Sequence, residues 1–524
     1  MRYRSFLINI ASIFDKPGML AIVSGILIAS AFPKIGFSFV IWFSLIPLLV
    51  ALENASNRTA FRVGFTCGFV TYACVLYWIN IVITKYGNLP WVVSIPLYLA
   101  LSTWLALFYG LAALVSCFGE RVGLKKVFTL PVCWIACDFM RSFLLTGFPW
   151  AMLGHSQYRT LTLIQIADIA GVYGITFMIV LANVVCYRVV RASFGAKVSY
   201  PLKSAAVLLI ALVITLLYGF YRLNATETPS GNSLRVALIQ GNISQDIKWS
   251  PEFRDQTIAI YERLTRDAGK EKKIDLIVWP ESAVPFFFQD QPQEAERIRA
   301  LARELDSYLL FGSPAYEQRN GQPVLLNSGI MIDPTGKTVA RGDKIHLVPF
   351  GEYVPMRSIF PFISKIVVGI GDFSPGEYAK PLPAGKAEAG LLVCYEAIFP
   401  ELAREYVNNG ANILVNITND AWFGNSSAPY QHLSIAVLRA VETRTPLIRA
   451  ANTGITAIVD QNGHIRAMTN LFEETLKTDD ITPGTADSFY LKTGDIAARL
   501  CVTLMILITL IAWFRLRKNV KIQP

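Results

Sequence analysis

Eight apolar stretches near the length of a membrane-spanning helix constrain what this chain can fold into. They lie at 17–31, 37–52, 61–83, 91–118, 127–145, 161–190, 205–221 and 496–514. A helix needs about 20 mostly apolar residues to cross a bilayer, so the pattern predicts seven spans, a break and an eighth span. The mean hydropathy of +0.42 is also too high for an ordinary soluble chain of 524 residues. We therefore expect a membrane α-helical bundle of about eight spans.

Between the seventh and eighth stretches the sequence changes to the pattern of a globular domain. Strand-like runs lie at Leu234–Gln240, Ile274–Val278, Tyr308–Phe311, Leu325–Ile332, Gly390–Cys394, Asn412–Ile417, Leu447–Ala451 and Thr456–Val459. Helix-like runs between them include Pro251–Ala268, Glu294–Asp306 and Ala428–Thr445. This alternation predicts an α/β layered domain.

These patterns divide the chain into four predicted regions. Residues 1–223 form a seven-span membrane domain, 224–495 form the globular domain, 496–514 form the last span, and 515–524 form a basic tail.

The formal net charge of +10 belongs to the membrane part of the chain. Residues 224–495 contain 26 Lys and Arg against 33 Asp and Glu, whereas the rest contains 22 against 5. Nucleic-acid binding therefore loses its main support. Basic residues such as Arg58, Lys125 and Arg188 gather in loops on one side, which the positive-inside rule assigns to the cytoplasm. An odd number of spans then places residues 224–495 on the outer face.

Cys394, in GLLVCYEAIFPE (390–401), is the one cysteine of eight that lies in the polar middle of the chain. The other seven lie in apolar stretches near the two ends. A thiol here has two interpretations. It is either a small buried hydrophobic side chain or a nucleophile.

Three predicted strand ends carry reactive groups. They are Glu281 in VWPES, Lys344 in GDKIHLVPFGEYVP and Cys394 in LLVCYE. A cysteine nucleophile needs a base, and Glu281 is a candidate to accept its proton. Lys344 and a backbone N–H after Cys394 are candidates to stabilise an oxyanion. Taken singly, a Glu or a Lys is more often a solvated side chain.

Histidine is the more usual base for a catalytic cysteine, so His346, His432 and His464 leave a Cys/His protease open. No two histidines have ligand spacing and the domain has no second cysteine, so we predict neither a metal site nor a cofactor.

Two apolar segments are unusual for an outer domain. They are VPFFF (284–288) and IFPFISKIVVGI (359–370). Each belongs either to the core or to an exposed arm that touches lipid, because exposed apolar surface usually marks an interaction site.

Glu281, Lys344 and Cys394, in this order, resemble the Glu-Lys-Cys triad of the nitrilase superfamily. Its domains are αββα sandwiches that cleave or transfer amides, nitriles and esters through a cysteine thioester. With seven spans before such a domain and one after it, the whole chain resembles the bacterial apolipoprotein N-acyltransferase family. Five short motifs agree with this resemblance. They are GFPW (147–150), GHSQ (154–157), QGNISQDIKW (240–249), LVPFGEYVP (347–355) and NITNDAWFG (416–424).

The resemblance implies a two-step acyl transfer in the bacterial inner membrane by an enzyme whose catalytic domain faces the periplasm. Nothing in the sequence demands a partner subunit, so we expect a monomer. Cys394 takes an acyl chain from a phospholipid as a thioester and passes it to the α-amine of S-diacylglyceryl-cysteine on an apolipoprotein. By that likeness Glu281 is the base and Lys344 the oxyanion partner. The implied supporting residues are Glu352, Tyr395 and Glu396, and the implied substrate-binding residues are Trp249, Trp150, Phe287 and Tyr353.

Two other functions stay open. A membrane-tethered amidase or nitrilase would share the triad and pass the acyl group to water. A transporter or scaffold would use the outer domain only for binding, with Asp138 and Asp168 as candidates for a polar pathway through the spans. The alternative to a polar pathway is that these two aspartates have a structural role at helix interfaces.

Overall fold

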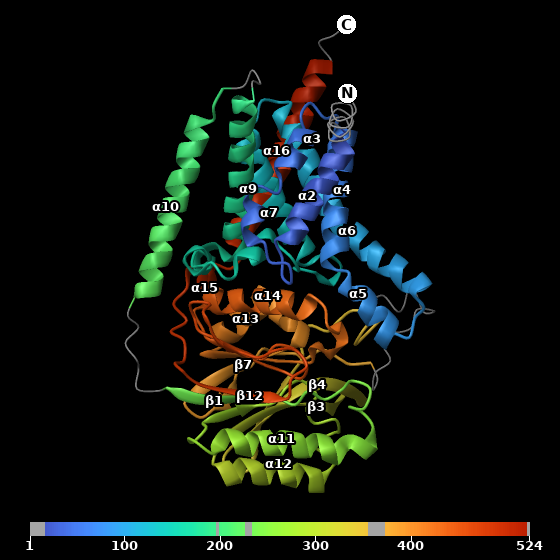
Figure 1. The fold of residues 1–524 in the computed structure, drawn as a ribbon, viewed down its shortest axis with the longest axis vertical. Helices are drawn as coiled ribbons and strands as arrows, with labels where there is room; N and C mark the ends of the chain where they lie inside the picture. Colours follow the sequence, from blue (N-terminus) through green and yellow to red (C-terminus); the bar gives the residue numbers. More distant parts are fainter. Residues whose placement is uncertain (1–15, 195–198, 226–232, 355–371, 521–524) are drawn as a thin grey trace, which may run out of the picture. The chain divides into compact units, whose positions relative to one another are not determined.

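The computed structural model describes residues 16–194, 199–225, 233–354 and 372–520 (Figure 1). The chain separates into two compact units. The first comprises Met1–Tyr77, Val92–Tyr221 and Asp495–Pro524, and the second comprises Trp78–Trp91 and Arg222–Gly494. The second unit therefore combines the region of the predicted globular domain with a short segment from the apolar N-terminal region.

The first unit is built from apolar helices. They are α2 (Pro17–Ser30), α3 (Ile46–Ala51), α4 (Asn57–Val75), α6 (Trp91–Glu120), α7 (Lys126–Arg141), α8 (Leu161–Ile164), α9 (Ala167–Ser193), α10 (Leu202–Asn224) and α16 (Ile496–Val520). Among the described residues, α6, α9, α10 and α16 are long and apolar enough to cross a membrane. A fifth candidate is α4 together with Trp78–Tyr86, a pair bent by 49°.

The predicted count of about eight spans is therefore not confirmed. The stretches at 17–31 and 37–52 form shorter apolar helices. The stretch at 127–145 yields α7, whose 16 residues extend only roughly 24 Å.

Small residues let the helices of this unit approach closely. A Cβ on Gly64 of α4 would lie 2.6 Å from the Cβ of Ala113 on α6, and a Cβ on Gly68 would lie 2.8 Å from that of Tyr109. Contact between backbones at such positions is the usual basis of helix association in lipid.

The two aspartates of the predicted polar pathway have partners, Asp138 within its own helix α7 and Asp168 across a helix interface. Arg141 Nε donates to Asp138 at 2.8 Å, and the hydroxyl of Tyr218 on α10 donates to Asp168 on α9 at 2.8 Å. These contacts favour a structural role for both carboxylates, because a buried charge needs such partners.

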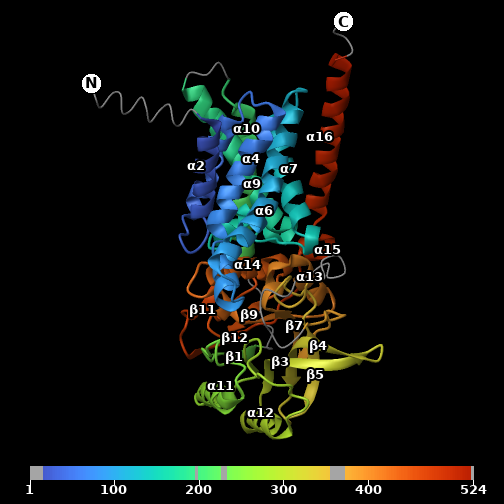
Figure 2. The same cartoon turned by 90° about the vertical axis from the view of Figure 1, so that its right-hand side faces the viewer.

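Two six-stranded sheets form the centre of the second unit (Figure 2). The first has the order β12-β1-β2-β3-β4-β5 and the second the order β11-β10-β9-β8-β7-β6. The strands of the first sheet are β1 (Leu234–Gln240), β2 (Leu276–Val278), β3 (Tyr308–Arg319), β4 (Gln322–Ile332), β5 (Thr338–Asp343) and β12 (Thr475–Ile481). Those of the second are β6 (Leu382–Ala384), β7 (Ala387–Val393), β8 (Ile413–Thr418), β9 (Leu447–Ala451), β10 (Ala457–Val459) and β11 (Ile465–Met468). In each sheet three parallel strands are flanked by antiparallel ones.

The sheets pack face to face, and helices cover their outer faces (Figure 1). A Cβ on Gly329 of β4 would lie 2.6 Å from the Leu391 side chain of β7, which places the two sheets in contact. Helices α11 (Arg254–Gly269) and α12 (Pro292–Leu305) bury Ile258 and Ile298 in the core of the first sheet. Helices α13 (Pro400–Asn408) and α14 (Ala428–Thr443) belong to the second sheet, and Tyr406 of α13 packs against Gly390. The predicted αββα sandwich is confirmed.

All predicted strands and helices of this domain are present, although β3 is much longer than predicted. Strands β6, β11 and β12 were not predicted, and β5 was predicted only as a strand end before Lys344. The sequence of β12, TLKTDDI, has no apolar alternation because the strand lies at a sheet edge and is mostly half-buried.

The segment VPFFF belongs to the core, so the exposed-arm hypothesis is wrong for it. Val284, Phe286 and Phe288 are buried in the hydrophobic cluster beneath α11 and α12. Phe287 is partly buried, and its ring centroid lies 5.5 Å from that of Tyr316. The second apolar segment, 359–370, lies outside the described residues.

Replacing Leu391 by Ala tests the contact between the sheets. Leu391 is 1% exposed and fills the space above Gly329 and Gly342, so the change leaves a cavity. We expect a loss of about 2–5 kcal/mol in unfolding free energy, measured as a lower melting temperature in detergent. Val339→Ala, at a position 37% exposed on β5, is the control and leaves the melting temperature nearly unchanged. An equal effect of both changes would contradict this packing.

Candidate active site

Cys394 lies directly after β7, at the first residue of a 3-10 turn, Cys394–Ile398. Its φ of +55° lies in the left-handed region, which is strained for a residue other than glycine. Glu396 fixes the turn by accepting the N–H of Val393 at 2.6 Å. His432 Nε2 contacts the Cys394 carbonyl oxygen at 3.1 Å. The surroundings therefore hold the cysteine in a conformation that it would rarely adopt alone.

Glu281 follows β2, and both of its carboxylate oxygens have donors. Its Oε2 accepts the backbone N–H of Asn419 at 3.0 Å, and its Oε1 accepts from Asn327 Nδ2 at 2.8 Å. The side chain is 6% exposed. These donors fix the orientation of the carboxylate.

Lys344 follows β5 and lies between two carboxylates. Its Nζ is 2.9 Å from Glu352 Oε1 and 3.7 Å from Glu281 Oε1. Burial by itself lowers the pKa of Lys344, but Glu352 and then Glu281 outweigh it and raise the pKa above the usual range. Lys344 is therefore an ammonium ion at neutral pH.

The thiol of Cys394 is within electrostatic reach of both groups. Burial raises the pKa of Cys394 to about 12, Glu281 adds to the increase, and Lys344 opposes it. The thiol is therefore protonated in the resting site and needs a base at the moment of attack. The structure brings the three predicted catalytic residues into one buried cluster.

Two of the predicted supporting residues tie this cluster together. Glu352 Oε1 accepts from Lys344 and Asn327, and its Oε2 accepts the N–H of Val348 at 2.8 Å. Glu396 Oε1 accepts the N–H groups of Ile345 and His346 at 2.6 and 2.8 Å. Glu396 thus links the cysteine turn to the segment that carries Lys344.

Burial raises the pKa of Glu396 to about 7, although three backbone N–H groups oppose the increase. The third supporting residue, Tyr395, packs its ring on Phe399 at a centroid distance of 5.1 Å.

A buried polar network behind the cysteine was not predicted. Burial and then Arg449 lower the pKa of His432, so its ring is neutral. Its Nε2–H then donates to the Cys394 carbonyl, while its Nδ1 accepts from Arg449 at 3.1 Å. Arg449 also pairs with Asp420 at 2.6 Å. Because its Nε2–H is used on the backbone, His432 is not placed as the base of a Cys/His protease.

One feature of the sequence could have predicted this network. Arg449 interrupts the buried strand LIRAA, and a charge inside such a strand requires a partner. Asp420 lies in NITNDAWFG, a motif that the sequence analysis quoted without assigning this residue a role.

Lys248 was also missed, although it lies in the motif QGNISQDIKW. It is 2% exposed, and its Nζ donates to the backbone carbonyl of Glu281 at 3.0 Å. Burial lowers the pKa of Lys248 to about 8, against the opposing influence of Glu281 and Cys394.

The predicted substrate-binding residues are divided between the two units. Trp249 is 37% exposed beside Lys248, and Tyr353 is partly buried beside Glu352. Trp150 lies in the first unit, 1% exposed, with its ring centroid 5.8 Å from that of Phe148. The substrate roles of these residues and of Phe287 stay predictions.

The segment Trp78–Trp91 packs against the turn that follows β8. Trp78 and Phe423 have ring centroids 4.9 Å apart, and the Tyr86 hydroxyl donates to the Ala421 carbonyl at 2.8 Å. This turn, Asp420–Phe423, directly follows Asn419, whose N–H holds Glu281. A segment from the apolar N-terminal region thus braces the catalytic cluster.

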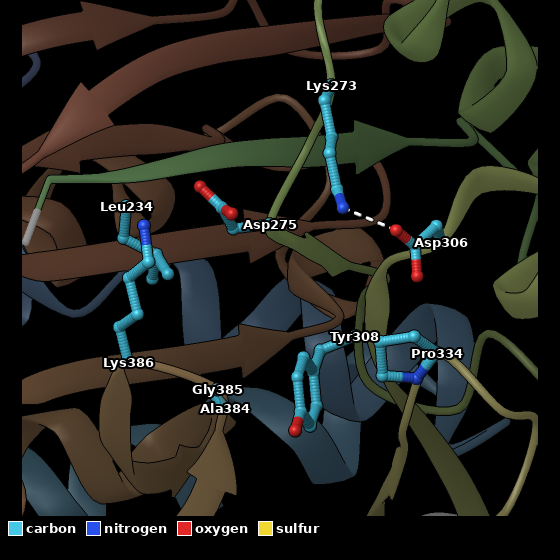
Figure 3. Close-up of a pocket in the computed structure, with 9 residues that line it drawn as sticks. All are labelled: Leu234, Lys273, Asp275, Asp306, Tyr308, Pro334, Ala384, Gly385 and Lys386. Carbon is cyan, nitrogen blue, oxygen red and sulfur yellow. Dashed lines mark hydrogen bonds and ion pairs between the residues drawn. The ribbon is translucent and has the colours of Figure 1, made fainter.

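Figure 3 shows a surface pocket that is separate from this cluster. Its lining includes Leu234 and Tyr308, the first residues of β1 and β3, with Lys386 in the turn after β6. Glu281 and Cys394 follow the opposite, carboxyl ends of parallel strands, where α/β sheets bind their ligands. The pocket is therefore not the candidate active site.

Two family profiles match the chain. The apolipoprotein N-acyltransferase N-terminal domain matches residues 24–185, and the carbon-nitrogen hydrolase domain matches residues 235–490. An apolipoprotein N-acyltransferase of Geobacter metallireducens is 52% identical over 486 residues, which cover 92% of this chain and 93% of that protein. One of Haemophilus influenzae is 33% identical over 511 residues, which cover 96% of each. A solved amidase of the nitrilase superfamily from Nesterenkonia is 20% identical and covers 52% of this chain and 98% of its own, with a TM-score of 0.39.

The two packed sheets and the matching profile define the second unit as a domain of the carbon-nitrogen hydrolase class. The chain as a whole belongs to the apolipoprotein N-acyltransferase family.

Replacing Arg449 by Met tests the network behind Cys394. The change leaves Asp420 buried without its main cation, and breaking a buried pair in this way costs about 3–5 kcal/mol. We expect a clear fall in the melting temperature in detergent. Arg466→Met, which removes an exposed ion pair with Asp479, is the control and costs about 0–1 kcal/mol. Equal melting temperatures for the two variants would show that the buried pair does not stabilise the site.

Proposed function

We propose that this chain transfers an acyl chain from a phospholipid to the α-amine of S-diacylglyceryl-cysteine at the N-terminus of an apolipoprotein. The observation that carries the proposal is the burial of Glu281, Lys344 and Cys394 in one cluster. This cluster belongs to a carbon-nitrogen hydrolase domain on a chain that also contains apolar helices of spanning length.

In the first step Glu281 takes the thiol proton of Cys394 as Sγ attacks the ester carbonyl of the phospholipid. The resulting tetrahedral oxyanion is stabilised by the ammonium of Lys344 and by a backbone N–H after Cys394. The intermediate then collapses. The ester C–O bond breaks, the departing alkoxide takes the proton from Glu281, and a lysophospholipid leaves behind a thioester.

In the second step the α-amine of the acceptor attacks the thioester carbonyl. Glu281 takes a proton from the amine, and the C–S bond breaks as the amide forms. The sulfur regains its proton from Glu281, which returns the site to its starting state. Glu352, Tyr395 and Glu396 act as supports, while Trp249, Trp150, Phe287 and Tyr353 are the proposed contacts of the substrates.

We place the enzyme in the bacterial inner membrane with the catalytic domain in the periplasm. The support for this orientation is the basic excess in the loops assigned to the cytoplasm. Both substrates are anchored in the bilayer, so a tethered domain meets them at a raised effective concentration. The proposed mechanism requires no second chain, and we propose that the enzyme acts as a monomer.

The amidase alternative receives less support. Relatives that carry the transferase name match over both the helical and the hydrolase regions, whereas an amidase that acts on soluble substrates needs no such anchor.

The test is the intact mass of the detergent-purified protein after exposure to phosphatidylethanolamine. We expect a gain of one acyl chain, labile to hydroxylamine, and a matching release of lysophospholipid. Cys394→Ser abolishes the gain. Cys501→Ser, a matched change in α16, keeps it. Addition of a diacylated lipopeptide with a free α-amine then discharges the adduct onto the peptide.

Two results would overturn the proposal. An adduct that persists in Cys394→Ser would place the acyl group elsewhere. An adduct that decays to free fatty acid at the same rate with and without the lipopeptide would identify a hydrolase.

A further inference from the structure

Lys248 is a buried cation that the proposed mechanism does not use. It precedes α11 in the chain, is 2% exposed, and donates from Nζ to the Glu281 carbonyl at 3.0 Å. Within the part of the chain that the structure describes, this carbonyl is its one hydrogen-bond partner. An ammonium has three N–H groups, so this hydrogen bond leaves two donors.

Few charged or titratable groups act on the Lys248 ammonium. Glu281, after β2, and Cys394, after β7, both act on it. Asp246, on its own segment, is exposed. The Asp420–Arg449 pair and the neutral His432 lie behind Cys394 and add no net charge.

Counting charges shows what Lys248 contributes. Glu396 is left out of this count, because three backbone N–H groups hold its carboxylate. Without Lys248, the carboxylates of Glu281 and Glu352, the ammonium of Lys344 and the protonated thiol would together carry an excess of one negative charge. An unbalanced buried charge is costly. The ammonium of Lys248 brings the group to zero.

The balance holds at each step. When Glu281 takes the thiol proton, one negative charge moves from Glu281 to the sulfur and then to the oxyanion. The total stays at zero, so the reaction shifts charge within the site without creating any.

We infer that Lys248 is a positioning residue that fixes the Glu281 peptide and offsets the excess negative charge of Glu281, Glu352, Lys344 and Cys394 throughout the acyl-transfer cycle. The inference rests on the proposed function. Burial lowers the pKa of Lys248 to about 8, so the ammonium is present at neutral pH and is lost just above it.

The experiment measures the rate of thioester formation from phosphatidylethanolamine, without acceptor, from about pH 6 to about pH 10. In the wild type we expect the rate to fall above about pH 8, as Lys248 loses its proton. The thiol of Cys394, with a pKa of about 12, does not titrate there, and Glu396, with a pKa of about 7, titrates below it. Omitting the acceptor removes its amine from the titration.

Three variants separate charge from packing. Lys248→Met lowers the rate about 10²-fold at neutral pH and removes the alkaline fall, because no titrating ammonium remains. Lys248→Arg stays charged, keeps most of the rate and moves the fall to higher pH. Lys386→Met, in the exposed turn after β6, behaves as the wild type.

The outcomes are distinguishable. A wild type that forms no adduct refutes the proposed function. An adduct with equal rates and pH profiles in the wild type and Lys248→Met refutes this inference alone. A third outcome would show that Lys248 has only a packing role. In that case Lys248→Met and Lys248→Arg would both lose rate and melt at a lower temperature, and both would still show the fall in rate above about pH 8.

Discussion

The ion cluster around Lys344 is the interaction on which the rest of the catalytic domain depends. An ammonium that is 1% exposed needs negative partners, and Glu352 at 2.9 Å and Glu281 at 3.7 Å supply them. These carboxylates need donors in turn, which Asn327, Val348 and the N–H of Asn419 provide. The cluster therefore ties strand ends from both sheets to one point, and the two sheets must stay packed for it to exist.

The same cluster accounts for how a thiol with a raised pKa can act as the nucleophile of the proposed mechanism. Burial and Glu281 disfavour the thiolate, so the free thiol stays protonated and unreactive toward water-borne oxidants and electrophiles. In the proposed mechanism, the sulfur becomes reactive only when an ester carbonyl lies beside Sγ and the proton moves to Glu281 in the same step. Such control suits an enzyme that must hold a thioester without hydrolysing it.

Much of the catalytic domain was predictable from the sequence. Cys394 and Glu281 follow clear apolar runs, and Lys344 lies in a recognisable motif. The alternation of strands and helices predicted the layered fold.

Local patterns could not reveal β12, which is polar because it is an edge strand. They also could not reveal the packing of Trp78–Trp91 against Asp420–Phe423, which joins segments far apart in the chain. Lys248 and Arg449 were missed because a buried cation is recognised by its partners, and these appear only in the folded chain. Hydropathy also does not show where an apolar stretch breaks into short helices, so the predicted count of about eight spans is not confirmed.

The most direct test of the central claim is the rate at which a small neutral alkylating reagent modifies Cys394, mapped by peptide mass spectrometry. We predict that the rate rises continuously from about pH 6 to about pH 10 without a plateau, because the thiol has a pKa of about 12. A plateau that begins below about pH 8 would reveal a preformed thiolate and would contradict an account in which Glu281 removes the proton only during attack.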